Sequence, residues 1–156
     1  MKYKLFDKMA HATLLISALT FSGLSSAHEA GATMDPASTS ASFTGFAVVS
    51  CTSEGNLPTS YLEVSVKDTD VPQENLLINL QAFHLGGGVN RAVSTTDPIS
   101  GDDQFSPTVK VEAGNGTYYL IVNKTGVGPR SFTVSYHCKA ADGTHTPTDI
   151  GVYQFD

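Results

Sequence analysis

Apolar and polar residues alternate with a period of two through most of the chain after residue 43. In 131–139, Phe132, Val134, Tyr136 and Cys138 occupy every second position, with polar residues between them. The same alternation, or a denser apolar form of it, is found in 43–51, 61–67, 76–84, 108–112 and 117–123. This pattern is typical of β-strands that bury one face or both. No window has a sustained helical period.

Turn residues separate these segments, including the triple glycine at 86–88 and the Gly-Asn-Gly sequence at 114–116. Short strands divided by Gly and Pro turns favour an all-β fold, a single antiparallel β-sandwich of the immunoglobulin-like or jelly-roll-like kind. We assign residues 43–139 to this domain. The following segment, 140–156, is either an edge strand or a surface tail, because its apolar residues only approach an alternate spacing.

The first 27 residues have the order of a secretory signal peptide: a basic start, an apolar run over 10–24 and small residues at 25–27. Cleavage after Ala27 would make His28 the first residue of the mature chain. Cleavage after Ala32 is the alternative, since Ala30-Gly31-Ala32 has the same small-residue form. Residues 28–42 are small and polar without periodicity, and we expect a flexible leader there.

Export leads us to expect a periplasmic or extracellular protein with no membrane insertion after cleavage. Removal of 1–27 takes away three of the nine basic and one of the fifteen acidic residues, so the net charge falls from −6 to −8. Such an acidic chain is a poor partner for nucleic acid or anionic membranes. An unknown protein or small ligand remains as the partner.

The chain has two cysteines, Cys51 and Cys138. In an oxidising compartment two cysteines are expected to form a disulfide. Both fall on the inward sets of their predicted strands, where a bond between two sheets would lie. We therefore predict one Cys51–Cys138 disulfide.

One longer stretch is similar to a known family. Residues 109–122 (VKVEAGNGTYYLIV), a Gly-rich turn and the closing strand 131–136 (SFTVSY) follow one another. Over about 64–138 the chain resembles the bacterial pre-peptidase C-terminal type of β-sandwich. The resemblance implies a β-sandwich that serves as a non-catalytic appendage of secreted enzymes, used for secretion, substrate contact or stability.

The histidines His28, His84, His137 and His145 supply the candidate metal chemistry. An N-terminal His28 would offer its amine and its imidazole to one ion, and nitrogen ligands of this kind favour copper. A second histidine, His84 or His137, would complete an arrangement like the histidine brace of copper-binding secreted proteins. The predicted metal ligands are accordingly His28, His84 and His137.

The sequence gives less support for calcium binding and for catalysis. Two acidic clusters, one at Asp68, Asp70 and Glu74 and one at Asp97, Asp102 and Asp103, would suit calcium, but neither has the EF-hand spacing. The mature chain has no Gly-x-Ser-x-Gly elbow and no phosphate-binding loop. We therefore expect a non-catalytic binding or accessory protein that takes copper through His28. The alternatives are a structural or interaction module without metal, and a copper-dependent oxidative enzyme.

Overall fold

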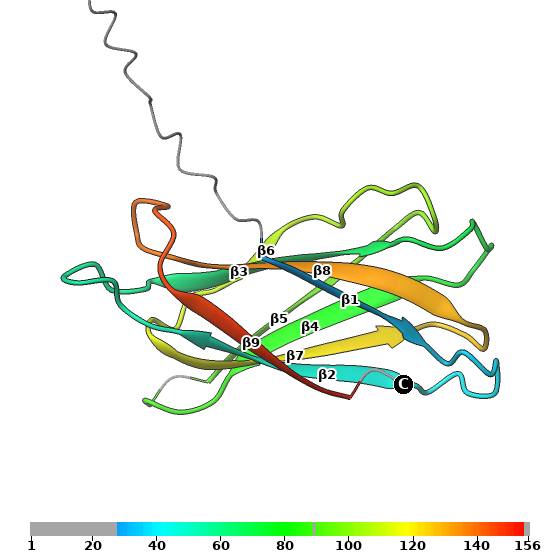
Figure 1. Cartoon of the computed structure of the whole chain (residues 1–156), viewed down its shortest axis with the longest axis horizontal. Helices are drawn as coiled ribbons and strands as arrows, with labels where there is room; N and C mark the ends of the chain where they lie inside the picture. The colour runs from blue at the N-terminus through cyan, green and yellow to red at the C-terminus, as the bar shows by residue number, and fades with distance from the viewer. Residues whose placement is uncertain (1–27, 89, 155–156) are drawn as a thin grey trace, which may run out of the picture.

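The structure, a computed structural model, describes residues 28–88 and 90–154, so the predicted signal peptide lies outside the described residues. Within them the chain forms nine strands (Figure 1). They are β1 (Glu29–Met34), β2 (Thr44–Cys51), β3 (Tyr61–Asp68), β4 (Ile78–His84), β5 (Arg91–Thr96), β6 (Val109–Val111), β7 (Gly116–Lys124), β8 (Arg130–Lys139) and β9 (Thr148–Gln154). None of the described residues forms a helix with the length and hydropathy that crossing a membrane requires.

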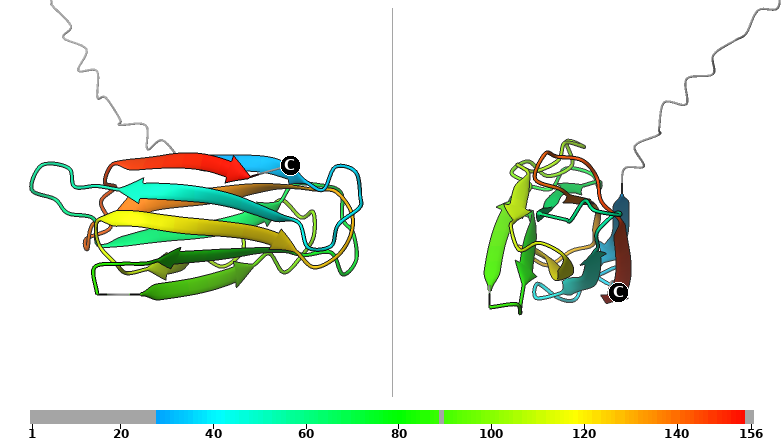
Figure 2. Two further views of the ribbon diagram at one scale, coloured as in Figure 1. Left: turned by 90° about the horizontal axis from the view of Figure 1, so that it is seen from below. Right: turned by 90° about the vertical axis from the view of Figure 1, so that its left-hand side faces the viewer.

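The strands make two antiparallel sheets that pack face to face (Figures 1 and 2). The four-stranded sheet has the order β1-β8-β3-β6, and the five-stranded sheet has the order β5-β4-β7-β2-β9. The prediction of an all-β antiparallel sandwich is confirmed. Its interior is formed by the alternate residues that the sequence pattern places on one face of each strand.

Strand β8 illustrates how the pattern becomes a core. Its even-numbered residues, from Phe132 through Cys138, are buried, and its odd-numbered residues are only half-buried. In the opposite sheet Tyr118, Leu120 and Val122 of β7 face the same interior. Each aliphatic side chain that is fully buried in this way contributes about 1.5–3 kcal/mol relative to exposure.

The predicted disulfide is present and links the two sheets. Cys51 ends β2 of the five-stranded sheet, and Cys138 lies near the end of β8 in the four-stranded sheet. Their Cα atoms are 5.5 Å apart, which is an ordinary separation for a disulfide. The bond joins positions 87 residues apart in sequence, and such a long loop gives a large entropic effect on the unfolded chain.

The expectation of a flexible leader over 28–42 is wrong for residues 29–34, which form β1. This strand pairs along its whole length with β8, from Glu29 opposite Ser135 to Met34 opposite Arg130. Its side chains are small, so they give no clear alternation of apolar and polar residues. The same small side chains allow β1 to pack closely on β8. A Cβ at Gly31 would lie 2.5 Å from the Phe132 carbonyl oxygen, so this approach requires glycine.

An ion pair fixes the chain after β1. Asp35 and Lys124 are both buried, and Lys124 Nζ donates to Asp35 Oδ2 at 2.9 Å. Asp35 also accepts hydrogen bonds from the backbone N–H groups of Thr39, Ser40 and Gly128. The bond to Lys124 lowers the pKa of Asp35 far below its usual range, against the opposing effect of burial. Buried charges need such partners, and here the partner holds the 35–40 turn on the sandwich.

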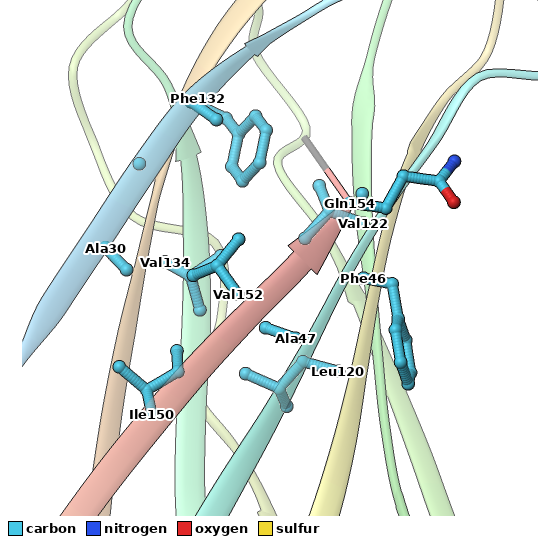
Figure 3. Close-up of a pocket in the computed structure, with 13 residues that line it drawn as sticks. Ala30, Phe46, Ala47, Leu120, Val122, Phe132, Val134, Ile150, Val152 and Gln154 are labelled. Carbon is cyan, nitrogen blue, oxygen red and sulfur yellow. The ribbon is translucent and has the colours of Figure 1, made fainter. Parts of the chain in front are cut away.

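The C-terminal segment forms the edge strand β9, one of the two alternatives left open by the sequence. β9 pairs with β2, and a bulge interrupts the pairing between Phe46 and Ala47. Strands β1 and β9 lie at the same side of the sandwich and leave a small apolar seam between the sheets (Figure 3). The sandwich therefore extends beyond the predicted 43–139 and includes strands at both ends of the described chain.

Candidate metal centre

Three histidines converge at one end of the four-stranded sheet. His28 directly precedes β1, His137 lies on β8, and His145 lies in the 140–147 connection between β8 and β9. Each offers one ring nitrogen, and the three nitrogens lie within 4.8 Å of one another. Among the described residues this is the one group of three or more His, Cys, Asp or Glu side chains close enough to share an ion.

The spacing of the rings suits a small transition-metal ion. The ring centroids of His137 and His145 are 4.7 Å apart, and those of His28 and His137 are 5.9 Å apart. Both pairs meet edge to face, at 71° and 67°, rather than stacked. A metal–nitrogen bond of about 2.0–2.1 Å separates two ligand nitrogens by about 3–4 Å. Small rotations of the rings would therefore bring all three nitrogens onto one ion.

Two of the ring nitrogens have no partner in the described protein. His28 Nδ1 and His137 Nδ1 are both buried, and neither makes a hydrogen bond. Buried polar atoms are usually satisfied, and these two nitrogens keep their lone pairs or protons free of any protein partner. In a mature chain that begins at His28, Nδ1 is also the ring nitrogen that can form a chelate ring on one ion together with the α-amine of the same residue.

The remaining nitrogen of His137 is oriented by a neighbour on the same strand. His137 Nε2 lies 3.0 Å from Ser135 Oγ. When Nε2 carries the proton and donates it to this hydroxyl, the lone pair is on Nδ1. Metal-binding histidines usually have such a partner on the other nitrogen, which fixes both the tautomer and the ring orientation. Ser135 is therefore placed to prepare His137 as a ligand.

The local electrostatics favour the neutral form of His137 and His145. Burial lowers the pKa of His137, and proximity to His145 and Lys139 lowers it further. Burial and then Lys139 lower the pKa of His145 as well. Glu63 acts in the opposite direction on both rings without reversing the result. Neutral imidazole is the form that binds a metal, so both side chains are ready to do so near pH 7.

Glu63 supplies negative charge beside the cluster. It pairs with Lys139 at 2.5 Å and with Lys110 at 3.7 Å. Burial acts to raise its pKa, but the bond and charge of Lys139, with help from Lys110, lower the pKa overall. Glu63 also lines a groove next to His137 and His145, together with Ser65 and Thr108. The groove gives a small molecule or ion access to the histidines.

The connection that carries His145 is held on both sides. The backbone N–H of Thr146 donates to the Cys138 carbonyl at 2.9 Å, and the Thr146 hydroxyl lies 2.6 Å from that of Thr59. Asp142 caps the backbone N–H of Thr144 at 2.9 Å. Residue 145 itself bridges to Lys139. The disulfide at Cys138 therefore anchors the stretch that supports both His137 and His145.

The predicted ligand His84 does not belong to this cluster. It lies on β4 in the other sheet, where it is buried against Tyr118 and its Nδ1 lies 2.9 Å from the Thr117 carbonyl oxygen. Its ring also covers Gly116, where a Cβ would come within 2.9 Å of His84 Cε1. His84 is thus a packed core residue. His145 takes the place that the sequence interpretation gave to His84.

The acidic residues do not converge on a calcium site among the described residues. Asp68 is buried beside Arg130, with 3.7 Å between Oδ2 and Nε, and it also accepts a hydrogen bond from Ser100. Asp97 accepts from the backbone N–H of Asp68, and burial raises its pKa. Asp103 pairs with Lys67 at 2.7 Å. These contacts give the carboxylates structural roles.

No known protein family, characterised protein or solved structure matches the chain. The resemblance to pre-peptidase C-terminal domains therefore stays a prediction. The geometry of the histidine cluster and of the surfaces around it is therefore the basis for inferring a function.

Proposed function

We propose that the protein is an exported copper-binding protein whose mature form holds Cu(II) with His28, His137 and His145. The observation that carries the proposal is the convergence of three ring nitrogens within 4.8 Å, with two buried Nδ1 atoms left without partners. The low histidine pKa values add to it, because protons compete weakly for these nitrogens near neutral pH.

Copper is the metal that this ligand set favours. All three ligands are nitrogens, and Cu(II) has the highest affinity among the divalent first-row metals for such sites. Cleavage after Ala27 would convert the His28 backbone nitrogen into an amine that can join Nδ1 on the same ion. A fourth nitrogen would favour the square arrangement of Cu(II) over the tetrahedral arrangement of zinc.

Export is the second part of the proposal. The basic, apolar and small-residue order of 1–27 supports it, and the Cys51–Cys138 disulfide is compatible with an oxidising compartment. The expected location is the periplasm or the extracellular medium. There the protein would serve as a binding or accessory protein, and a copper-dependent oxidative activity is the rival role.

The cleavage site is tested by the intact mass of the secreted protein. A mature chain that begins at His28 supports the amine ligand. A chain that begins at Thr33 lacks His28 altogether and contradicts the three-histidine site as proposed.

The metal site is tested by competition titration of the mature protein with Cu(II) and Zn(II), against a chelator of known affinity. We expect one equivalent of Cu(II) to bind more tightly than Zn(II), and His145→Ala to weaken that binding at least tenfold. The matched control is His84→Gln, which removes a histidine outside the cluster and should leave copper affinity unchanged. Equal losses in the two variants would contradict the site. Copper-dependent turnover of a reductant and oxygen by the loaded protein would support the oxidative role over the binding role.

A further inference from the structure

Four aromatic side chains form a continuous row across the outer surface of the five-stranded sheet. Phe83 on β4, Tyr119 on β7, Phe46 on β2 and Tyr153 on β9 follow one another on adjacent strands. Successive ring centroids are 5.3, 6.3 and 5.9 Å apart. The first two pairs are nearly parallel, at 22° and 9°, and Tyr153 is tilted by 43° from Phe46. We call the outward side chains of this sheet the aromatic face.

The rest of the aromatic face is almost uncharged, and it mixes polar residues with the aliphatic residues Val48, Ile121 and Ala92. Gln81, Asn79 and Asn123 are among its polar outward residues. The Asn79 side-chain amide donates a hydrogen bond to Asn123 Oδ1 at 3.0 Å. Thr96 extends this chain of hydrogen bonds to β5 by donating to Asn79 at 2.7 Å. Among the outward positions of the five strands only Asp149 carries a charge.

Tyr153 is the exposed member of the row, and Phe46, Phe83 and Tyr119 are half-buried. The five-stranded sheet is seen face-on in Figure 2 (left), and no described strand or loop crosses in front of it. Tyr153 is 70% exposed, and its ring lies over Gly151, where a Cβ would meet Tyr153 Cε2 at 3.1 Å. One side of this ring is therefore against the backbone, and the other is free. In Figure 3 the Phe46 ring likewise points away from the apolar seam.

We propose that the aromatic face binds a neutral polysaccharide that lies across β4, β7, β2 and β9. A sugar ring has a weakly polar C–H face, which packs on the electron-rich face of an aromatic ring, and a rim of hydroxyl groups. Each hydroxyl both donates and accepts, and so do the amides and hydroxyls that flank the row.

Charge selects against other occupants. An anionic glycan would need Lys or Arg on this face, and the net charge of −8 expected for the mature chain would repel it. Protein–protein interfaces are enriched in aromatic residues and in Arg, and they are depleted in Ser and Ala. Here Ser50, Ala92 and Ser94 share the face with the rings, and Arg does not. A neutral, hydroxyl-rich polymer is the partner that this composition fits.

The inference does not depend on copper, because the aromatic face and the histidine cluster belong to different sheets. Its test is therefore made on the metal-free mature protein in the presence of a chelator. Binding is measured to insoluble cellulose and chitin by depletion, and to cellohexaose and chitohexaose by calorimetry.

We expect binding to at least one of these glycans. Tyr153→Ala should weaken it by between about twofold and tenfold, and addition of Tyr119→Ala should weaken it further. The matched control is Tyr61→Ala, which removes a half-buried tyrosine from the outer surface of the four-stranded sheet and should leave glycan binding unchanged. Circular dichroism establishes that each variant is folded.

Three results would overturn the proposal. One is the absence of binding to all four probes, and another is an equal loss with Tyr61→Ala. The third is a concentration-dependent dimer, seen by sedimentation, that Tyr153→Ala disrupts without any glycan binding. That outcome would assign the face to a second copy of the chain.

Discussion

The two outer surfaces of the sandwich differ sharply in chemistry, although the strands beneath them follow the same alternation. We call the outward side chains of the four-stranded sheet the histidine face. It carries His137, Lys139, Glu63, Lys67 and Lys110, with ion pairs from Glu63 to two of the lysines. The aromatic face of the other sheet carries rings, amides, hydroxyls and a few aliphatic side chains, with Asp149 as its one charge among the outward positions.

The difference between the two faces lies in their outward residues, whereas the inward residues of both sheets are alike because they form the core. Inward residues on both sheets are aliphatic or aromatic and form one core, which any sandwich of this size needs. Outward residues are free of that requirement. A charged, histidine-bearing surface suits ions, and an uncharged aromatic surface suits a neutral polymer. The two proposals thus assign one ligand class to each face.

The disulfide gives the strongest way to disturb both faces at once, because it joins β2 to β8. Cys51→Ala with Cys138→Ala should lower the free energy of unfolding by about 2–5 kcal/mol. Urea denaturation of the metal-free protein measures this loss. A change below about 1 kcal/mol would contradict a large entropic effect of the disulfide on the unfolded chain.

His137→Ala tests whether the faces act separately. Loss of a central ligand should weaken Cu(II) binding by more than about a hundredfold, beyond the effect of losing a residue that only orients a ligand. Glycan binding to the aromatic face should stay the same. A parallel loss of both activities would mean that the faces are coupled and would contradict the comparison.

Ser135→Ala sharpens the account of the histidine face. Without the hydroxyl 3.0 Å from Nε2, His137 loses the partner that orients its ring. We expect copper affinity to fall by about tenfold, with no change in stoichiometry. Ser131→Ala, on the same strand and face, is the control, and an equal fall there would show that strand packing rather than ring orientation is responsible.

The pH dependence of stability should also trace to the histidine face. The pKa of His137 is lowered in the folded protein, so below the ordinary histidine value of about 6.5 the unfolded chain binds more protons than the folded one. Stability of the metal-free protein should therefore fall as the pH drops below about 6.5. His137→Gln should flatten this part of the profile, as followed by denaturation at several pH values. An unchanged slope in the variant would remove His137 as the cause.

Much of the fold could be predicted from the sequence because its signal is local. The period-two alternation in strands such as β3 and β8, together with Gly-rich turns, identifies strands, and strand phase places both cysteines inward. Strand β1 was missed because Ala30, Gly31 and Ala32 give almost no hydropathy contrast. Its strand form comes from backbone pairing with β8 and from close packing, which are non-local.

The histidine cluster was predicted only in part for the same reason. His28 and His137 lie together, but the sequence cannot show that His84 turns into the core while His145 returns beside His137. The usable signal for His145 is its place in the short connection after the strand that carries His137. The row of four rings was not predicted, since it joins strands that are distant in sequence and becomes visible only from the order β4-β7-β2-β9.

The most direct test of the central claim is the electron paramagnetic resonance spectrum of the mature protein with one equivalent of Cu(II). We expect a single bound species whose hyperfine pattern reports at least three nitrogen ligands. Replacement of His28, His137 and His145 by alanine should abolish that species. A spectrum of free copper, or the same bound species in the triple variant, would contradict the proposed site.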